Sequence, residues 1–333
     1  MVRVAINGFG RIGRLALRCG IGNPEIDFAA ITFSHGVQSA AHLFKYDSVH
    51  GKFDGEVKTD GENLVINGKK ILIINEREVA KMPWKKLGID VVLECTGEMR
   101  DKKEALAHIQ AGAKKVIISA PGKGDDLESY VIGINDKKQG FGEVVDNASC
   151  TTNCLMPVLE VLDKEFGIRR AFMTTIHAYT NDQRVLDGSH KDLRRARAAG
   201  LNIIPTTTGA KEAAAKIMPK LKGKVDGMAI RVPVPDGSLV DIVAELEKNT
   251  TEKEINSAMK KAADTYLKGI LEYSEEPLVS SDIVGNRHSS VFDALSTKVL
   301  GGNMVKVLSW YDNEMGYSQR IIDLAVKIGQ TSR

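Results

Sequence analysis

The sequence predicts an α/β protein in which a doubly wound parallel sheet is followed by an α+β domain with a mainly antiparallel sheet. Three observations support this fold class. Near the N-terminus, a buried strand runs directly into a glycine-rich turn and a helix. Continuous apolar strands then alternate with helical patterns, as in parallel sheets covered on both faces. After residue 150 the strands lengthen and several alternate apolar with polar residues, which is typical of an antiparallel sheet.

The turn after the first strand, residues 2–6, has the spacing of a dinucleotide-binding loop. Gly8, Gly10 and Gly13 follow the strand at once, and a helical pattern begins directly behind them. Glycines at these places permit a tight turn and a close approach of the backbone to a pyrophosphate at the helix N-terminus. We predict a Rossmann-type dinucleotide site; the alternative is a glycine-rich turn that binds nothing.

The second strand, residues 28–33, lacks the acid that usually follows the glycines of an NAD site by about 20 residues. The strand ends in Phe33, Ser34 and His35, and Asp27 lies at its other end. A carboxylate at the strand end would bind the adenosine ribose and repel a 2′-phosphate. Without it, Ser34 and His35 can supply donors to such a phosphate. The alternative is that Phe33 only packs against adenine and the cofactor preference is weak.

The rest of the chain completes two domains. Apolar runs at 64–66, 71–74, 91–96, 115–119 and 131–134 continue the first sheet, with a helical pattern at 103–110. Longer strands at 172–180, 228–234 and 239–246 build the second sheet, with a helix near 254–268. The last helical run, 317–328, is expected to return to the first domain. We therefore expect a dinucleotide-binding domain over 1–149, completed by a helix over 316–333, and a catalytic domain over 150–315.

Composition restricts the possible partners. The net charge of +3 is small for 333 residues, so nucleic acid is not predicted as the main partner. No apolar run reaches the length of a membrane span, and no secretory segment precedes the first strand. Four scattered cysteines do not form a disulfide framework, so we expect a reduced, cytoplasmic location. No His, Cys and acid cluster has metal-ligand spacing, so we predict no metal site.

Cys150 is the candidate nucleophile. It follows a strand-like run and precedes an apolar helical pattern, with Ser149 as a suitable N-cap. The N–H groups and the positive dipole end of a helix N-terminus favour a thiolate over a thiol. Pro157 complicates the helix, because proline inside a helix removes a hydrogen bond. The alternative is that Cys150 is a small buried apolar residue.

The segment 181–204 is a long loop rich in arginine, lysine and histidine. Long loops in compact domains are usually functional or disordered. We interpret it as an anion-binding loop beside the cysteine, or alternatively as a solvated or subunit-contacting basic loop.

The chain resembles the phosphorylating glyceraldehyde-3-phosphate dehydrogenase family over essentially its whole length. The matching stretches are 4–14, 42–51, 148–154, 176–183, 202–210 and 310–317. The resemblance implies reversible oxidation of glyceraldehyde 3-phosphate, with phosphate, to 1,3-bisphosphoglycerate. Cys150 would be the nucleophile that carries the thioester and His177 the base. The resemblance also implies a homotetramer.

Roles for the binding residues follow from the same resemblance. Thr180 and Arg231 would hold the substrate phosphate, and Arg195 would serve one of the two anion sites, although Arg194 is an alternative. The attacking phosphate would be held by Ser149, Thr151, Thr208 and Gly209. Cofactor contacts are implied for Gly8, Gly10, Arg11, Ile12, Gly13, Ser34, Arg77, Ser119, Ser189 and Asn313.

Two departures from the family pattern bear on the cofactor. NAD-linked members usually carry an acid where this chain has Phe33, and Leu-Pro where it has Gly188 and Ser189. In the family this loop reaches a neighbouring subunit's adenosine site. Ser189 would therefore donate to a 2′-phosphate, with Arg77 near the same ribose. We predict NADP as cofactor, preferred or used alongside NAD.

Two other functions remain open at this point. Erythrose-4-phosphate dehydrogenase shares the fold and the cysteine chemistry, but its members usually differ after the catalytic histidine, where this chain has Ala178 to Asn181. A non-catalytic role in binding RNA or another partner is the second alternative. Cys154 lies one helical turn beyond Cys150 and is interpreted as a packing residue or a resolving thiol.

Overall fold

A computed structural model describes residues 1–124, 126–137 and 140–331. The chain forms two compact units. The first contains residues 1–130, 138–149 and 318–333, and the second contains residues 131–137 and 150–317. The last two residues of the C-terminal helix predicted over 316–333 lie outside the described residues. In the described part of the chain, no helix is both long and apolar enough to span a membrane.

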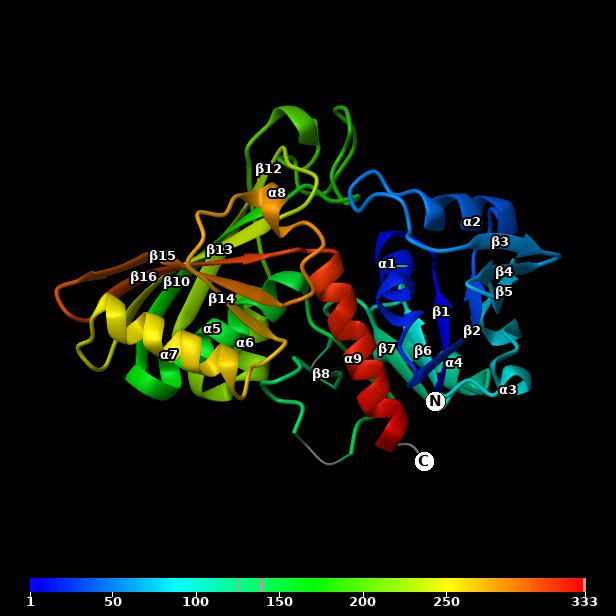
Figure 1. The fold of residues 1–333 in the computed structure, drawn as a ribbon, viewed down its shortest axis with the longest axis horizontal. Coiled ribbons are helices and arrows are strands. Elements are labelled where there is room, and N and C mark those ends of the chain that lie inside the picture. Colours follow the sequence, from blue (N-terminus) through cyan, green and yellow to red (C-terminus); the bar gives the residue numbers. More distant parts are fainter. Residues whose placement is uncertain (125, 138–139, 332–333) are drawn as a thin grey trace. The chain divides into compact units, whose positions relative to one another are not determined.

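The first unit is built on a nine-stranded sheet with the order β3-β4-β5-β2-β1-β6-β7-β9-β8 (Figure 1). Its strands are β1 (Val2–Asn7), β2 (Ile26–Thr32), β3 (Val57–Asp60), β4 (Asn63–Ile66), β5 (Lys69–Ile74), β6 (Val91–Glu94), β7 (Lys115–Ile118), β8 (Glu128–Ser129) and β9 (Val144–Asp146). β3, β4 and β5 pair antiparallel, and all other pairs in this sheet are parallel.

Helices cover both faces of this sheet. They are α1 (Arg11–Gly20), α2 (Gly36–Lys45), α3 (Trp84–Leu87), α4 (Lys102–Gln110) and the part of α9 (Met315–Thr331) that begins at Ser318; a short 3₁₀ turn, η1, spans Val79–Lys81. Ala5 and Val92 share one core cluster with Trp84 of α3 and Ala105 of α4. On the other face, Gly20 of α1 packs so closely on Phe28 and on Ile322 of α9 that a Cβ would lie 2.7 Å from the phenyl ring.

The second unit holds a seven-stranded sheet with the order β11-β12-β10-β13-β16-β15-β14. Its strands are β10 (Ile168–Ala178), β11 (Ile204–Thr206), β12 (Val225–Val232), β13 (Ser238–Leu246), β14 (Leu271–Ser274), β15 (Ser290–Leu300) and β16 (Met304–Tyr311). Only the pairs β10–β12 and β14–β15 are parallel among these described strands. The predicted fold class, a doubly wound parallel sheet with a second, mainly antiparallel sheet, is confirmed.

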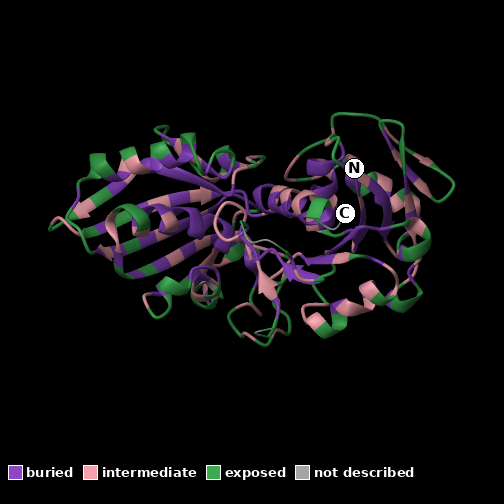
Figure 2. Ribbon diagram, turned by 90° about the horizontal axis from the view of Figure 1, so that it is seen from below, coloured by how far each residue is buried: buried purple, intermediate pink, exposed green. Residues whose placement is uncertain are grey.

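One face of the second sheet is covered by helices and the other is open. The covering helices are α5 (Cys150–Phe166), α6 (Ala210–Ile217) and α7 (Glu252–Asp264). The unit also contains the short helix α8 (Ser280–Ile283) and the 3₁₀ turns η2 (Ala199–Leu201) and η3 (Pro219–Leu221). Burial alternates along the strands, as the striped ribbons of Figure 2 show. In β10, Ala171 and Met173 are buried, whereas Phe172 between them is 69% exposed. The open face therefore carries apolar side chains.

Residues 131–134, predicted as a strand, form turns instead, and that prediction is wrong. Val131 is fully buried, so the apolar run does enter a core. Its backbone N–H donates to the Asn135 side chain at 2.8 Å, and Gly133 has a φ of 87°. A side-chain acceptor four residues ahead and a left-handed glycine bend the chain, which apolar content alone does not reveal.

Candidate functional site

The glycine turn between β1 and α1 is built for close backbone contacts. Gly8 has a φ of 94°, and a Cβ on it would lie 2.7 Å from the Thr96 nitrogen. A Cβ on Gly13 would lie 2.2 Å from the Gly8 carbonyl oxygen, whereas Gly10 has nothing within 4 Å. Two of the glycines therefore close the turn, and Gly10 leaves open backbone beside the start of α1 at Arg11 and Ile12. This arrangement fits a pyrophosphate at a helix N-terminus.

The other cofactor candidates of the first unit follow the carboxyl ends of its parallel strands. Ser34 follows β2, Arg77 follows β5, whose Ile74 pairs with Thr32, and Ser119 follows β7. These strands flank β1 and β6 in the sheet, so the structure brings these residues to the edge that carries the glycine turn. This is the edge at which open α/β sheets bind ligands. Asn313 belongs to the second unit and is described there.

A strained turn leads from β9 to α5. Ala148 has a φ of 53°, a conformation that L-residues other than glycine rarely adopt. Its backbone N–H donates to the buried Asp146 carboxylate at 2.7 Å. α5 then begins at Cys150, as the N-cap character of Ser149 predicted, and runs through Pro157 without ending. The nucleophile candidate therefore lies in the first turn of a long, buried helix.

Cys150 and His177 are in hydrogen-bond contact. The Cys150 Sγ lies 3.4 Å from the His177 Nε2. The His177 Nδ1 lies 2.6 Å from the Ala178 carbonyl oxygen, which can only accept, and 3.1 Å from the Arg231 Nη1, which can only donate. The shorter contact, to the carbonyl oxygen, favours the tautomer with the ring proton on Nδ1. Nε2 is then the unprotonated nitrogen that faces the sulfur. An imidazole in this tautomer can take the thiol proton as the sulfur attacks an electrophile.

The surroundings of Cys150 and His177 do not favour the thiolate that the sequence predicted. Burial, reinforced by the Arg231 charge, lowers the pKa of His177 to about 3. Burial raises the pKa of the Cys150 thiol, although the positive charge of Arg231 acts in the opposite direction. Sequence analysis expected a thiolate at Cys150, but burial disfavours the charged forms of both groups. The surroundings of the pair therefore favour a thiol beside a neutral imidazole over a thiolate beside an imidazolium.

Cationic side chains lie next to the pair. Arg231 of β12 is opposite His177 in the strand register, and its Nη1 lies 3.1 Å from the Ala178 oxygen and 3.3 Å from the Thr180 Oγ1. Arg195 contributes a charge that lowers the pKa of both His177 and Arg231. The structure therefore brings Cys150, His177, Thr180, Arg195 and Arg231 together.

Arg195 and Arg194 differ in their surroundings. Arg195 pairs with Asp182 and donates to the Thr206 Oγ1 at 2.9 Å and the Thr207 oxygen at 3.2 Å. Only 17% of its side chain is exposed. Arg194 is exposed and reaches the Pro205 oxygen at 3.5 Å. Thr208 and Gly209 follow in the connection from β11 to α6.

The remaining candidates come from distant parts of the sequence and lie in different settings. Thr151 is buried, and its hydroxyl lies 3.0 Å from the Tyr311 hydroxyl. Asn313 is buried and its side-chain oxygen accepts from the Ser238 hydroxyl at 2.5 Å. Ser189 is on the exposed basic loop, where its carbonyl oxygen accepts from Arg184 at 2.7 and 2.9 Å. These contacts hold Asn313 and the Ser189 backbone in defined positions.

Comparison with known proteins agrees with this geometry. Residues 2–102 match the model of the glyceraldehyde 3-phosphate dehydrogenase NAD binding domain, and residues 149–313 match that of the glyceraldehyde 3-phosphate dehydrogenase C-terminal domain. The chain is 56% identical over 329 residues to a glyceraldehyde-3-phosphate dehydrogenase of Geobacillus stearothermophilus, covering 98% of each chain. The chain belongs to the glyceraldehyde-3-phosphate dehydrogenase family.

Other members of this family are similar along nearly the whole chain. Glyceraldehyde-3-phosphate dehydrogenase 1 of Bacillus subtilis is 55% identical, over 99% of this chain and 98% of that protein. A chloroplastic glyceraldehyde-3-phosphate dehydrogenase of Arabidopsis thaliana is 53% identical, over 97% of this chain and 83% of that protein. The family and the NAD binding domain make this chain an oxidoreductase that uses a nicotinamide dinucleotide.

Sequence reasoning gave no role to Tyr311 and Asp182, which contact residues of the candidate site. The Tyr311 hydroxyl contacts the Thr151 and Thr175 hydroxyls at 3.0 and 2.8 Å, and its ring meets His177 edge to face. Asp182 pairs with both Arg195 and His190. Tyr311 and Asp182 lie within matching stretches of the sequence, but only the strand register and the loop path show what they touch.

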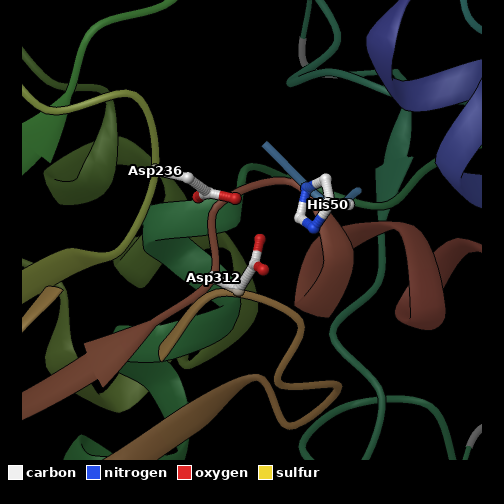
Figure 3. A group of neighbouring side chains, drawn as sticks. All are labelled: His50, Asp236 and Asp312. Carbon is white, nitrogen blue, oxygen red and sulfur yellow. The ribbon is translucent and has the colours of Figure 1, made fainter. Parts of the chain in front are cut away.

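Asp236 and Asp312 form a pair of buried carboxylates in the second unit (Figure 3). Asp236 accepts from the backbone N–H groups of Gly237 and Asn313, and Asp312 accepts from those of Gly285 and Met315. His50, also drawn in Figure 3, belongs to the first unit. These hydrogen bonds hold the backbone on both sides of Asn313.

Proposed function

We propose that the protein is a phosphorylating glyceraldehyde-3-phosphate dehydrogenase with Cys150 as nucleophile and His177 as base. The observation that carries the proposal is the 3.4 Å contact between the Cys150 Sγ and the unprotonated Nε2 of His177, in a chain of this family. The sulfur adds to the aldehyde carbon while Nε2 takes the thiol proton and passes it to the aldehyde oxygen, which gives a thiohemiacetal and leaves the imidazole neutral again. The Cys150 backbone N–H, in the first turn of α5, is suited to stabilise the oxyanion together with His177.

Oxidation then needs a base for the hydroxyl proton of the thiohemiacetal. His177 supplies it through Nε2. The nicotinamide dinucleotide, when bound, provides the hydride acceptor, and the glycine turn with Ser34, Arg77 and Ser119 would hold it from the first unit. Asn313 would orient the carboxamide, because its side-chain oxygen is fixed by Ser238. The product is a thioester on Cys150, and inorganic phosphate attacks it, displaces the sulfur and forms an acyl phosphate.

The reaction handles two anions, and the arginines near His177 suit them. Thr180 and Arg231 would hold the substrate phosphate, with Arg195 serving one of the two sites. The Arg231 Nε has no hydrogen-bond partner among the residues that the structure describes, which leaves a donor for an anion. Arg195 is favoured over Arg194 because its charge reaches His177 and Arg231. Ser149, Thr151, Thr208 and Gly209 would hold the attacking phosphate.

The activity test follows the reduced nicotinamide by absorbance, with glyceraldehyde 3-phosphate, phosphate and either cofactor. We expect phosphate-dependent turnover that Cys150→Ser abolishes without loss of the fold. Cys154→Ser is the matched control, since Cys154 is buried against Ser290 and Ser309. It should retain turnover. Near-normal turnover of Cys150→Ser would contradict the covalent route, and faster turnover of erythrose 4-phosphate would favour the competing aldehyde.

NADP is the proposed cofactor, preferred or shared with NAD. The end of β2 carries Phe33, Ser34 and His35 and no acid. The Phe33 ring is held edge to face between Phe9 and His35. Nothing in this segment repels a 2′-phosphate, and Ser34 offers it a hydroxyl. The same assay decides the point, because a strong preference for NAD in kcat/KM would contradict it.

We further propose a homotetramer. Phe172, Met228 and Val243 are 69%, 42% and 38% exposed on the open face of the second sheet. Phe172 pairs directly with Val243, and Met228 lies two residues beyond Asp226, the β12 partner of Phe172. Exposed apolar side chains that lie side by side on a sheet face are typical of an interface between subunits. Within each subunit we propose a dinucleotide-binding domain of 1–149 with the C-terminal helix, and a catalytic domain of 150–315, in a cytoplasmic enzyme.

A further inference from the structure

Glu94 ends β6 beneath the glycine turn, and it is almost fully buried at 1% exposure. One carboxylate oxygen accepts from the Asn7 Nδ2 at 2.5 Å and contacts the His108 Nε2 at 3.1 Å. The other accepts from the Thr96 backbone N–H at 2.8 Å and from the Thr96 hydroxyl. One buried side chain thus joins β1, β6 and α4.

The direction of these hydrogen bonds is fixed by Trp84. Its indole N–H can only donate, and it lies 2.9 Å from the His108 Nδ1. His108 therefore accepts at Nδ1 and carries its proton on Nε2, which donates to Glu94. All four groups around the carboxylate are donors, and Trp84 and His108 are themselves fully buried. A buried network of this kind is rigid only while every member is satisfied.

The network continues into the turn itself. The Thr32 hydroxyl donates to the Asn7 side-chain oxygen at 2.7 Å and accepts from the Gly8 backbone N–H at 2.9 Å. On the other side, Gly8 lies against Thr96, which Glu94 also holds. Glu94 is therefore linked to both backbone segments that meet at Gly8.

We propose that Glu94 is a positioning residue for the dinucleotide: its carboxylate, oriented by His108 and Trp84, holds Asn7 and Thr96 so that the turn at Gly8 is formed before the cofactor arrives. The inference rests on the dinucleotide site at this turn. Preformed turns bind more tightly because less ordering accompanies binding. Loss of the carboxylate should weaken dinucleotide binding while the chemistry at Cys150 stays intact.

The test variant is Glu94→Gln, which keeps the shape but places an amide N–H₂ against groups that are all donors. Its matched control is Asp90→Asn, which immediately precedes β6 at the opposite end of the same strand. Asp90 is 7% exposed and accepts from the Arg3 backbone N–H at 2.9 Å and from Lys114 at 2.8 Å. Dissociation constants for NADP and NAD are measured by calorimetry, alongside thermal unfolding and the rate of Cys150 alkylation by iodoacetamide without cofactor.

We expect the dissociation constants of Glu94→Gln to rise by about tenfold, the effect of roughly one disrupted buried hydrogen bond. Asp90→Asn should lose stability but bind within about twofold of the wild type, because its contacts with Arg3 and Lys114 lie at the other end of β6 from the glycine turn and act independently of it. Alkylation should be unchanged in both variants. In steady state, KM for the cofactor should rise more than kcat falls.

Equal affinity of Glu94→Gln and wild type would overturn the proposal, and so would an equal loss in Asp90→Asn, since general loosening of the sheet would then explain the effect. If Glu94→Gln does not fold, Thr32→Val removes the hydroxyl between Asn7 and Gly8 and should weaken binding in the same way; unchanged affinity there would also overturn it. A wild-type protein that binds neither dinucleotide would refute the cofactor site itself.

Discussion

The protonation of the His177 ring is determined by the groups around it. Its Nδ1 lies 2.6 Å from the Ala178 oxygen and 3.1 Å from the Arg231 Nη1, and burial together with the Arg231 charge lowers its pKa to about 3. A histidine in the unfolded chain titrates near 6.5. The folded state therefore binds fewer protons than the unfolded state between about pH 6.5 and about pH 3. The stability contributed by the neutral ring is present above about pH 6.5 and is lost as the pH falls towards 3.

His177→Asn should change both activity and the pH dependence of stability. We expect kcat to fall by about 10²–10⁴-fold, because a positioned base is removed. Between pH 8 and pH 5 the wild type should lose roughly 2 kcal/mol more free energy of unfolding than the variant, since the variant has no ring to protonate. Urea unfolding at the two pH values measures this. Parallel pH profiles of the two proteins would show that His177 does not carry the effect.

For single residues, the sequence predicted which side chains belong to the site better than it predicted their protonation states. Cys150 and His177 could be predicted because local motifs surround them, and the helix start at Cys150 follows from Ser149. Their neutral forms could not be predicted, because burial and the proximity of Arg231 come from the pairing of β10 with β12. Tyr311 was missed for the same reason: its contacts with Thr151 and Thr175 join segments far apart in the chain.

In the element formed by β1, the glycine turn and α1, two glycines serve different purposes. Gly13 is needed for packing, and Gly10 is needed for access of a ligand to the backbone. At Gly13 a Cβ would lie 2.2 Å from the Gly8 carbonyl oxygen, so the side chain is excluded by the fold. At Gly10 nothing lies within 4 Å, so the fold tolerates a side chain there. The backbone at Gly10 is nevertheless the part of the turn that a pyrophosphate would approach.

Gly13→Ala and Gly10→Ala should therefore differ in what they lose. We expect Gly13→Ala to lower the free energy of unfolding by about 1–3 kcal/mol through overpacking, and to weaken the dinucleotide as well. Gly10→Ala should retain the stability of the wild type while its dinucleotide affinity falls. Thermal unfolding and calorimetric titration make the comparison. Normal cofactor affinity in Gly10→Ala would place the pyrophosphate elsewhere.

Elements defined by local signals were predicted closely. The sequence placed helices near 103–110 and 317–328, and the structure has Lys102–Gln110 and Met315–Thr331. Residues 131–134 were predicted wrongly, because a buried turn held by Asn135 has the same apolar content as a strand. Pro157 argued against a continuous helix, but α5 continues through it. The residues before and after Pro157 are buried, so tertiary packing holds the helix together there.

At the scale of the whole molecule, the proposal of a homotetramer rests on the open face of the second sheet. Helices α5 and α7 cover its other face, so Phe172 and its neighbours are left in solvent in an isolated chain. The sequence showed alternation along these strands and predicted one covered face. It could not show that the other face exposes adjacent apolar side chains, because that depends on the register that places Phe172 beside Val243.

Phe172→Glu should dissociate the homotetramer into smaller species, because a buried carboxylate would face an apolar surface without a partner. Tyr266→Glu is the control, since Tyr266 is 39% exposed in the helical layer, where it packs on Lys164 of α5. Sedimentation velocity should show the wild-type mass for the control only. A tetrameric Phe172→Glu protein would mean that this face is not the interface.

The contacts of the Arg195 guanidinium link phosphate binding to the conformation of the basic loop, residues 181–204. Each of its three nitrogens already engages one of Asp182, Thr206 and Thr207, so a phosphate bound there competes with the Asp182 carboxylate for the positive charge of the guanidinium. The loop that carries Ser189 begins at that same aspartate and is tied to it again through His190. Anion binding and loop conformation are thus thermodynamically linked: whatever fixes the loop alters phosphate affinity, and phosphate alters the loop by the same free energy.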